Sequence, residues 1–379
     1  MTDIAGASLI ETAPEVPPPF PLDESQSLHA LGLTRAEFSA WRKKHPQALR
    51  DTYRNLMRDG EGLTLPSPTR RTDCPSDGTL KFCLPAGTSA AGQSFESESV
   101  IIPMTSYRGT NWFTLCISSQ IGCRMGCTFC ETGRMGLIKN LSAGEIVRQR
   151  LVARKLRAQF IPPDAPVTQY YSDGIQNIVF MGMGEPLDNF DNVTQAIRVF
   201  SEPLGMNFPH AQITLSTVGR IDGLKKLAAL KWHNLRIAIS LNAANDKLRD
   251  ELMPINRGMP LADLKRTLHE YPLAPKGRFL IEYVMIKGIN DSLADAAAVA
   301  NFCQDLPCIV NLIPYNPQRY ATFETPTDET IQAFLQDLKS KGIFVKRRIT
   351  HGRDLMGACG QLGNPDLRRK PAALTTNQT

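Results

Sequence analysis

The chain has 379 residues, of which 42% are apolar and 21% are charged. This composition is typical of a folded globular protein, and no apolar run reaches the roughly 18 residues that a transmembrane helix needs, so disordered, collagen-like and membrane-spanning chains are excluded. Lys and Arg number 43 against 37 Asp and Glu, and the net charge of +6 permits a nucleic-acid partner without requiring one. The N-terminus has neither a basic start nor an apolar core, so we expect a cytoplasmic protein without a secretory leader.

The first 95 residues divide into two parts. Residues 1–27 are acidic and rich in proline, which favours extended geometry, and we expect a flexible tail there. Residues 28–95 are expected to form a small accessory region that is first helical and then β. A T-x-x-E capping box begins one helix at Thr34, and Gly60 ends the next, before the sequence turns to proline, glycine and serine.

Residues 96–361 alternate between short apolar runs and helix-like stretches. Six runs are typical of buried parallel strands: WFTLCIS, NIVFMGM, AQITLST, LRIAISL, FLIEYVMI and CIVNLIP. Helices are expected between them at 142–157, 191–201, 221–231, 246–252, 261–271 and 291–304, followed by a helix at 328–341 and a strand at 343–349. Six units fall short of a closed eight-stranded barrel, so the pattern predicts an open, partial α/β barrel with ligands at the carboxyl ends of its strands. Residues 362–379 are expected to be a tail.

Three of the nine cysteines share one short loop. Cys123, Cys127 and Cys130 form a CxxxCxxC motif directly after the first predicted barrel strand, and this spacing indicates a metal centre. A [4Fe–4S] cluster with three protein ligands leaves one iron open for a small molecule. The alternative is a structural zinc site that Cys116 or Cys359 completes.

A glycine-rich turn, Gly182–Met183–Gly184–Glu185–Pro186, follows the second predicted strand. Glycine allows backbone polar groups to approach a ligand closely, and Glu185 supplies a negative charge for an ammonium group. Together and in this order, the cysteine loop and the turn resemble the radical S-adenosylmethionine (SAM) superfamily. The resemblance implies that the open iron binds the amino and carboxylate groups of SAM, and that the turn binds the amino group.

A closer resemblance, to the RlmN/Cfr family of radical SAM RNA (adenine) methyltransferases, extends from Asp77 to Leu362. The motifs that carry it are DGTLKF, ESVIIP, TLCISSQIGC, MGMGEPLDN, ITLSTVG, AISLNAANDKLRDELMPIN, IEYVMI, NLIPYNP and ACGQL. It implies a partial (βα)6 radical SAM barrel with a small N-terminal helical and β extension, a [4Fe–4S] cluster, and SAM used twice. It also implies methylation of an adenosine ring carbon, C2 favoured and C8 open, in ribosomal RNA, transfer RNA or both.

The same resemblance assigns roles to single residues. Cys123, Cys127 and Cys130 match the cluster ligands. Cys359 matches the cysteine that is methylated during turnover, Cys116 the second mechanistic thiol, and Glu98 the proton acceptor. The positions that match cofactor contacts are Gly184, Glu185, Ser216, Ser240, Leu241, Asn242 and Asn316.

Three features depart from the family pattern. The N-terminal region is short, the loop CETGRMGLIKNL is closer to Cfr-type members, and Asn242 stands where the usual motif has histidine. We expect a monomer that receives electrons from a donor such as flavodoxin or ferredoxin. Basic clusters that could contact RNA are 42–44, 346–348 and 368–370. Two alternatives remain open: a radical SAM enzyme acting on a protein or small molecule, and a zinc-stabilised RNA-binding protein without catalysis.

Overall fold

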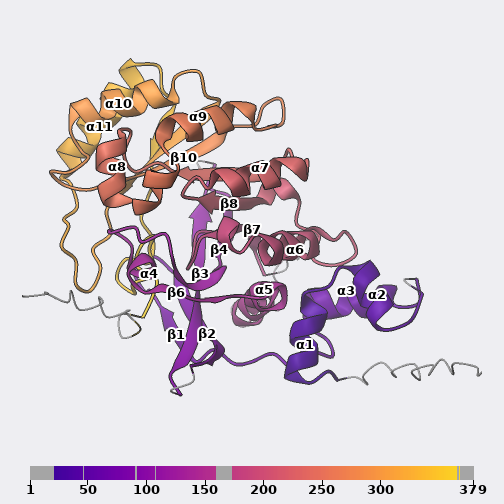
Figure 1. Ribbon diagram of the computed structural model, residues 1–379. Coiled ribbons are helices and arrows are strands. Elements are labelled where there is room, and N and C mark those ends of the chain that lie inside the picture. The colour runs from indigo at the N-terminus through magenta and orange to yellow at the C-terminus, as the bar shows by residue number, and fades with distance from the viewer. Residues whose placement is uncertain are drawn as a thin grey trace, which may run out of the picture.

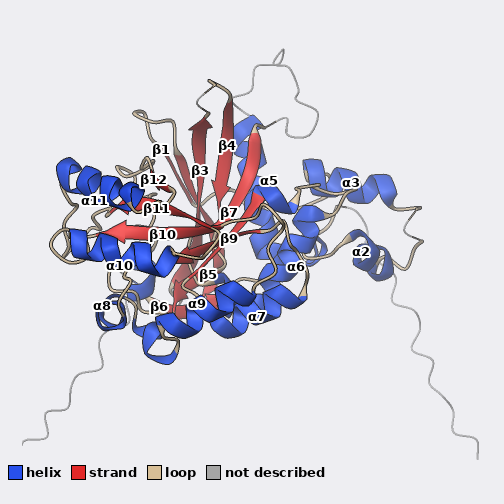
Figure 2. Ribbon diagram, turned by 90° about the horizontal axis from the view of Figure 1, so that it is seen from above, coloured by secondary structure: helices blue, strands red, loops and turns tan. Residues whose placement is uncertain are grey.

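A curved ten-stranded sheet forms the centre of the molecule, in the order β1-β2-β3-β4-β7-β8-β9-β10-β11-β12. The structure is a computed structural model that describes residues 21–45, 47–89, 92–106, 108–158, 173–364 and 367. Most helices lie on the outer side of the sheet (Figures 1 and 2). None of the helices in these ranges is both long and apolar enough to cross a membrane.

The parallel part of the sheet confirms the predicted partial barrel. Its seven strands pair in chain order, each parallel to the next. Six correspond to the apolar runs of the sequence and the seventh to the strand expected near residue 345. They are β4 (Asn111–Cys116), β7 (Ile175–Phe180), β8 (Ile213–Thr217), β9 (Arg236–Ser240), β10 (Phe279–Met285), β11 (Cys308–Pro314) and β12 (Val345–Arg347).

The helices between these strands lie where the sequence predicts them, with ends that differ by a few residues. Their buried residues recur at helical spacing, as Val193, Ile197 and Phe200 do on α6, so that one face covers the sheet. The helices are α5 (Ala143–Ala158), α6 (Phe190–Ser201), α7 (Ile221–Ala229), α8 (Asp246–Leu252), α9 (Leu261–Glu270), α10 (Leu293–Cys303) and α11 (Asp328–Ser340). Short 3-10 turns occupy Pro186–Asp188 (η1), His210–Gln212 (η2) and Pro254–Gly258 (η3).

An antiparallel extension of the sheet corrects the expected domain boundary between residues 95 and 96. β1 (Arg70–Asp73), β2 (Leu80–Thr88) and β3 (Ser94–Thr105) pair antiparallel in order, and β3 pairs antiparallel with β4. The boundary therefore falls inside β3. The sequence conceals this strand because its first half, SFESES, is polar, although its backbone groups still need partners in a ladder.

Both expected tails are shorter than the sequence suggests. Helix α1 (Glu24–Leu31) begins inside the predicted N-terminal tail, with Asp23 as its cap and Leu22 fully buried before it. At the other end, Leu362 is buried. Residues 1–20 and 368–379, which make up most of the two expected tails, lie outside the described residues.

The N-terminal helices pack against the outer helices of the barrel. Helix α2 (Arg35–Trp41) begins at the predicted capping box, where the backbone N–H of Thr34 donates to Glu37 at 2.8 Å. Helix α3 (Arg50–Asp59) ends at Gly60 as predicted, and the Gly60 backbone is left-handed. Figure 1 shows all three helices beside α5 and α6. The contact with α5 is close enough that a Cβ atom on Gly144 would lie 1.8 Å from the carbonyl oxygen of Leu28.

Replacing Gly144 with alanine should therefore destabilise the protein. Alanine is the better helix former, but its methyl group would displace backbone of α1, and overpacking of this kind costs about 1–3 kcal/mol. Urea denaturation would measure the loss. Gly258→Ala is the matched control because nothing lies within 4 Å of its Cβ position. Equal stability of Gly144→Ala and the wild type would show that α1 does not pack on α5 in this way.

Candidate active site

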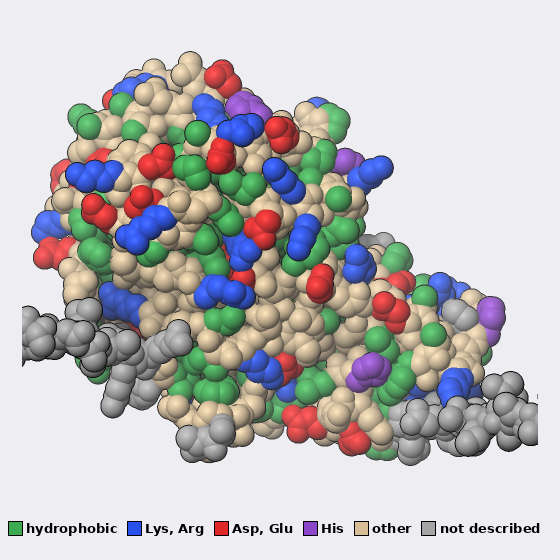
Figure 3. All heavy atoms as spheres, in the orientation of Figure 1, with side chains coloured by type: hydrophobic (Ala, Val, Ile, Leu, Met, Phe, Trp, Pro, Cys, Tyr) green, Lys and Arg blue, Asp and Glu red, His purple; other side chains and the backbone are tan. Residues whose placement is uncertain are grey.

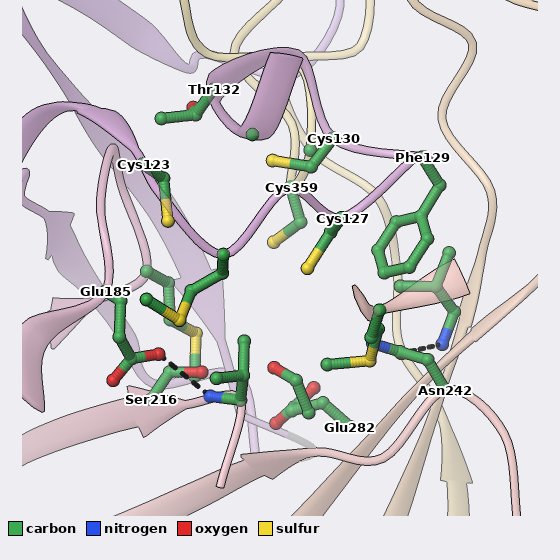
Figure 4. Close-up of a pocket in the computed structure, with 18 of the residues that line it drawn as sticks. Cys123, Cys127, Phe129, Cys130, Thr132, Glu185, Ser216, Asn242, Glu282 and Cys359 are labelled. Atoms are coloured by element: carbon green, nitrogen blue, oxygen red, sulfur yellow. Dashed lines mark hydrogen bonds between the residues drawn. The ribbon is translucent and has the colours of Figure 1, made fainter. Parts of the chain in front are cut away.

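A pocket of about 970 Å³, including the open solvent at its mouth, lies at the carboxyl ends of the parallel strands. This is where α/β sheets place their ligands. Figure 4 shows side chains from several strands and loops converging on it. The predicted site residues that line it are Cys123, Cys127, Cys130, Gly184, Glu185, Ser216, Ser240, Asn242 and Cys359.

The three-cysteine loop runs from β5 (Gln120–Cys123) to the short helix α4 (Glu131–Arg134), and β6 (Gly136–Asn140) pairs with β5. The thiols of Cys123, Cys127 and Cys130 face the pocket (Figure 4). Burial raises the pKa of all three. A bound metal ion favours the thiolate form of such buried cysteines, because it supplies compensating positive charge. A set of three sulfur donors around one cavity therefore fits an iron–sulfur cluster.

The glycine turn places a buried carboxylate on the pocket wall. Gly184 has φ +100°, and a Cβ atom there would lie 2.6 Å from Cβ of Gln120, so only glycine fits. The Glu185 carboxylate accepts hydrogen bonds from the backbone N–H groups of Leu187 (3.0 Å) and Val218 (2.9 Å). Burial outweighs these bonds and raises the pKa of Glu185 to about 7. A ligand cation here would restore the charge that burial disfavours.

The ends of β8 and β9 supply Ser216, Ser240 and Asn242. Asn242 has a left-handed backbone (φ 58°), which asparagine tolerates better than most residues, and its Oδ1 accepts from Val284 N–H at 2.9 Å. The Leu241 side chain is fully buried outside the pocket lining, and its N–H donates to the carbonyl of Glu282 at 3.0 Å.

A buried arginine donates hydrogen bonds to the residues that follow β8 and β9. Arg249, on α8, is 1% exposed. Its guanidinium donates to the carbonyl of Val218 at 2.7 Å, to that of Leu241 at 3.1 Å and to the side chain of Asn256. Burial lowers its pKa to about 10, so it remains charged near neutral pH.

Cys359 is presented by a segment that is tied to the cysteine loop. The N–H of Glu131 donates to the carbonyl of Gly360 at 2.8 Å. The amide of Asn316 donates to the carbonyl of Cys359 at 3.2 Å. Asn316 is buried outside the pocket lining, so in this structure it contacts the segment and not the cavity.

Cys116 and Glu98 lie just outside the pocket lining. Burial raises the pKa of Cys116 to about 12, and the nearby Cys359 adds to the increase, so Cys116 rests as a thiol. Cys116 ends β4 opposite Val100, and Glu98 shares a face of β3 with Val100 because side chains alternate along a strand. Glu98 is 2% exposed and pairs with Lys81 at 2.7 Å.

Two charged residues of the pocket were not among the predicted site residues. Glu282 on β10 lines the cavity and contacts Asn311 (2.9 Å) and Arg348 (3.5 Å). It is the only charged residue in the run FLIEYVMI, a signal that could have identified it. Arg348 belongs to the basic cluster 346–348, a candidate RNA contact in the sequence, and it lines the pocket. Burial alone would lower its pKa, yet the nearby Cys359, Glu282 and Cys116 raise it.

Comparison with known proteins agrees with this geometry. The Radical SAM superfamily profile matches residues 117–300. The probable dual-specificity RNA methyltransferase RlmN 1 of Protochlamydia amoebophila is 44% identical over 273 residues, which are 72% of this chain and 71% of the relative. The dual-specificity RNA methyltransferase RlmN of a Chelativorans species is 41% identical over 298 residues, 78% of this chain and 71% of the relative. The crystal structure of a radical SAM methyltransferase from Sphaerobacter thermophilus has a TM-score of 0.75 and 33% identity, covering 87% of this chain and 98% of that one.

Fold, pocket and relatives agree on the class: this is a radical SAM enzyme, which uses a [4Fe–4S] cluster and SAM. The extent of the match to the curated relatives shows more, since the chain belongs to the RlmN family. This membership confirms the resemblance noted in the sequence and excludes a zinc-stabilised binding protein without catalysis.

The raised pKa of Glu185 predicts a pH dependence of stability in the cluster-free protein. A carboxyl group whose folded pKa is raised from 4.5 to about 7 binds more protons in the folded than in the unfolded state across that range. The unfolding free energy should therefore fall as the pH rises from about 4.5 to about 7, at up to about 1.4 kcal/mol per unit.

Urea denaturation of the wild type and Glu185→Gln at about pH 5 and about pH 7.5 would test this. The loss of stability between the two pH values should be smaller in the variant, by about 1–3 kcal/mol. Identical losses in both proteins would contradict the raised pKa.

Proposed function

We propose that this protein methylates a ring carbon of adenosine in RNA through a methylated cysteine. The observation that carries the proposal is that Cys359 lines the same pocket as the three-cysteine loop, with Cys116 close behind it. The printed names of the relatives, dual-specificity RNA methyltransferases, support RNA as the substrate class. C2 is the first choice of target atom and C8 the alternative, in ribosomal RNA, transfer RNA or both.

The pocket residues form two groups, one that would hold the cluster and one that would bind SAM. Cys123, Cys127 and Cys130 would hold the cluster through their thiolates. Glu185 would bind the amino group of SAM, while Gly184, Ser216, Ser240, Leu241, Asn242 and Asn316 match its other contact positions. When bound, the cluster and SAM supply a methyl group and a 5′-deoxyadenosyl radical.

A cysteine thiolate can accept a methyl group by polar transfer, whereas a ring carbon of adenine cannot. An aromatic C–H carbon has no lone pair with which to attack a sulfonium methyl, whereas the Cys359 thiolate does and becomes an S-methyl thioether. Loss of a hydrogen atom from that methyl leaves an unpaired electron on its carbon, which bonds to the adenine ring and joins protein and RNA covalently. The adduct must then lose one electron, which a bound cluster would accept. Glu98 takes the proton from the ring carbon.

Cys116 completes the reaction by releasing the RNA. Its thiolate attacks the sulfur of Cys359, forms a disulfide and breaks the bond between that sulfur and the methylene carbon. The electron pair of the broken bond stays on the methylene, which gains a proton and becomes the new methyl group. The Arg348 guanidinium lies near both cysteines and opposes part of the increase that burial causes in the pKa of Cys116.

RNA would approach the pocket across β12. Lys346 and Arg347 are exposed on this strand, directly before Arg348 in the pocket wall. Figure 3 shows basic side chains interspersed with acidic ones on the face drawn there. We place the RNA contact at Lys346 and Arg347 because these two exposed residues directly precede the pocket wall in the chain. Arg42, in another predicted cluster, is buried. Binding through phosphates should weaken with salt. A monomer in the cytoplasm that receives electrons from a flavodoxin or ferredoxin completes the proposal.

Mass spectrometry of the digested protein should find one methyl group on Cys359 after expression in cells that supply iron, sulfide and SAM. The methyl group should persist in Cys116→Ala, because that thiol acts after methylation. Wild-type protein in which Cys359 stays unmodified, even after reconstitution with cluster and SAM, would exclude the two-cysteine mechanism.

Cys116→Ala should also accumulate a covalent protein–RNA adduct, since nothing then attacks the Cys359 sulfur. Denaturing gel electrophoresis with labelled RNA would detect the adduct, and methylated RNA should fall at least about a hundredfold, as expected when an essential nucleophile is lost. Cys83→Ala is the control because Cys83 is also a buried thiol of this sheet, on β2. An equal adduct in both variants would argue against Cys116 as the resolving thiol.

A further inference from the structure

The segment that carries Cys359, residues 352–363, is attached by its flanks to the hairpin of β2 and β3. The N–H of Gly352 donates to Asp77 at 2.7 Å, just before β2. On the near side of Cys359, Lys81 Nζ donates to the carbonyl of Met356 at 2.8 Å. On the far side, the N–H of Gly363 donates to Glu98 at 3.2 Å. We call residues 352–363 the Cys359 segment.

One ion pair connects the contacts at Met356 and Gly363. Lys81 Nζ lies 2.7 Å from Glu98 Oε2, the same oxygen that accepts from Gly363, and the two side chains are only 11% and 3% exposed. Arg70 adds a weaker contact, 3.8 Å from the other oxygen of Glu98. A buried pair with its hydrogen bonds satisfied holds its partners firmly, and removal of either charge leaves the other uncompensated.

Strand register places this pair next to the resolving thiol. Lys81 pairs with Val100 across β2 and β3, and Val100 pairs with Cys116 across β3 and β4. Directly paired residues share a face of the sheet, as do residues two apart on a strand, so Lys81, Glu98 and Cys116 share one face. The Cys359 segment lies over it, since a Cβ atom on Gly357 would be 3.7 Å from Val100.

The tip of the segment has separate attachments. The contacts of Glu131 and Asn316 described above hold Gly360 and Cys359 on the pocket side. The far flank has a second attachment, since the hydroxyl of Thr132 donates to the carbonyl of Leu362 at 2.5 Å. The pocket therefore holds the tip, while the Lys81–Glu98 pair holds Met356 and Gly363, on the two sides of Cys359, against the sheet.

We propose that Lys81, through its pair with Glu98, is a positioning residue that latches the Cys359 segment, and that neutralising Glu98 opens the latch. The second clause rests on the proposed function, in which Glu98 takes the proton from the adenine ring. That proton converts the carboxylate into a carboxylic acid while Lys81 keeps its charge, so the ion pair is lost. The flanks are thereby freed at the stage when Cys116 must reach the sulfur of Cys359.

Hydrogen–deuterium exchange of the full-length, cluster-free protein tests the latch independently of catalysis. In Lys81→Met, and in Glu98→Gln as a mimic of the protonated acid, exchange within residues 352–363 should accelerate at least about tenfold, the effect of losing one charged hydrogen bond. Lys81→Arg should stay close to the wild type.

Lys139 provides a matched control. Its Nζ also bridges a carboxylate and a backbone carbonyl, Glu145 at 2.7 Å and Ala86 at 2.8 Å, but neither belongs to the Cys359 segment. Lys139→Met should leave exchange in residues 352–363 unchanged. Unchanged exchange there in both Lys81→Met and Glu98→Gln, or equal acceleration throughout the chain, would overturn the latch.

A second measurement separates positioning from mere stabilisation. In the reconstituted enzyme, Lys81→Met should form several times more 5′-deoxyadenosine per methylated RNA than the wild type, and Lys81→Arg should restore the ratio. An unchanged ratio in Lys81→Met would leave Lys81 a purely structural role and overturn the proposal. If the wild type methylates no RNA, the proposed function fails, while the exchange result still decides whether Lys81 holds the segment.

Discussion

The pocket depends on one buried cation that binds the ends of neighbouring strands. The Arg249 guanidinium donates to the carbonyl groups of Val218 and Leu241, which directly follow β8 and β9. A parallel sheet leaves such carbonyl groups without partners where its strands stop. The side chains of Ser216 and Ser240 project from the same strand ends. The hydrogen bonds of Arg249 therefore fix the relative positions of Ser216 and Ser240 without a bound ligand.

The antiparallel hairpin of β2 and β3 adjoins the pocket through β4 and carries Glu98, the proposed proton acceptor. The barrel strands and the cysteine loop form a chamber suited to a cluster and SAM, while β3 and β4 present Glu98 and Cys116 on an adjoining face. The Cys359 segment spans the two, with its tip on the chamber and its flanks on the hairpin. In the proposed reaction Cys359 first faces a cofactor and later another thiol, and such a bridge would suit both positions.

Sequence alone predicts the elements whose signals are local. Continuous apolar runs and helical spacing locate the barrel strands and their helices, and the CxxxCxxC loop and glycine turn locate the pocket. A strand whose own residues are polar gives no such signal: the first half of β3 is polar, and only its pairing with the neighbouring strands β2 and β4 shows that it belongs to the sheet. In the sequence, Arg348 is the last of three consecutive basic residues, and only the structure shows that it lines the pocket, directly after β12. The Lys81–Glu98 pair joins residues whose neighbours carry no charge pattern that would connect them to Cys359.

Asn242 has a consequence for how the pocket responds to its surroundings. Just after β9, the side-chain oxygen of Asn242 accepts a hydrogen bond from the N–H of Val284 on β10. The backbone carbonyl of Asn242 does not make this bond, because the left-handed backbone turns it in another direction. The side-chain amide therefore adds one hydrogen bond between the two strands, as a backbone peptide group would. Histidine, usual at this position in the family pattern, changes charge near neutral pH, whereas an amide does not. This stretch of the pocket wall therefore keeps the same charge and the same hydrogen bond in mildly acidic and in mildly alkaline solution.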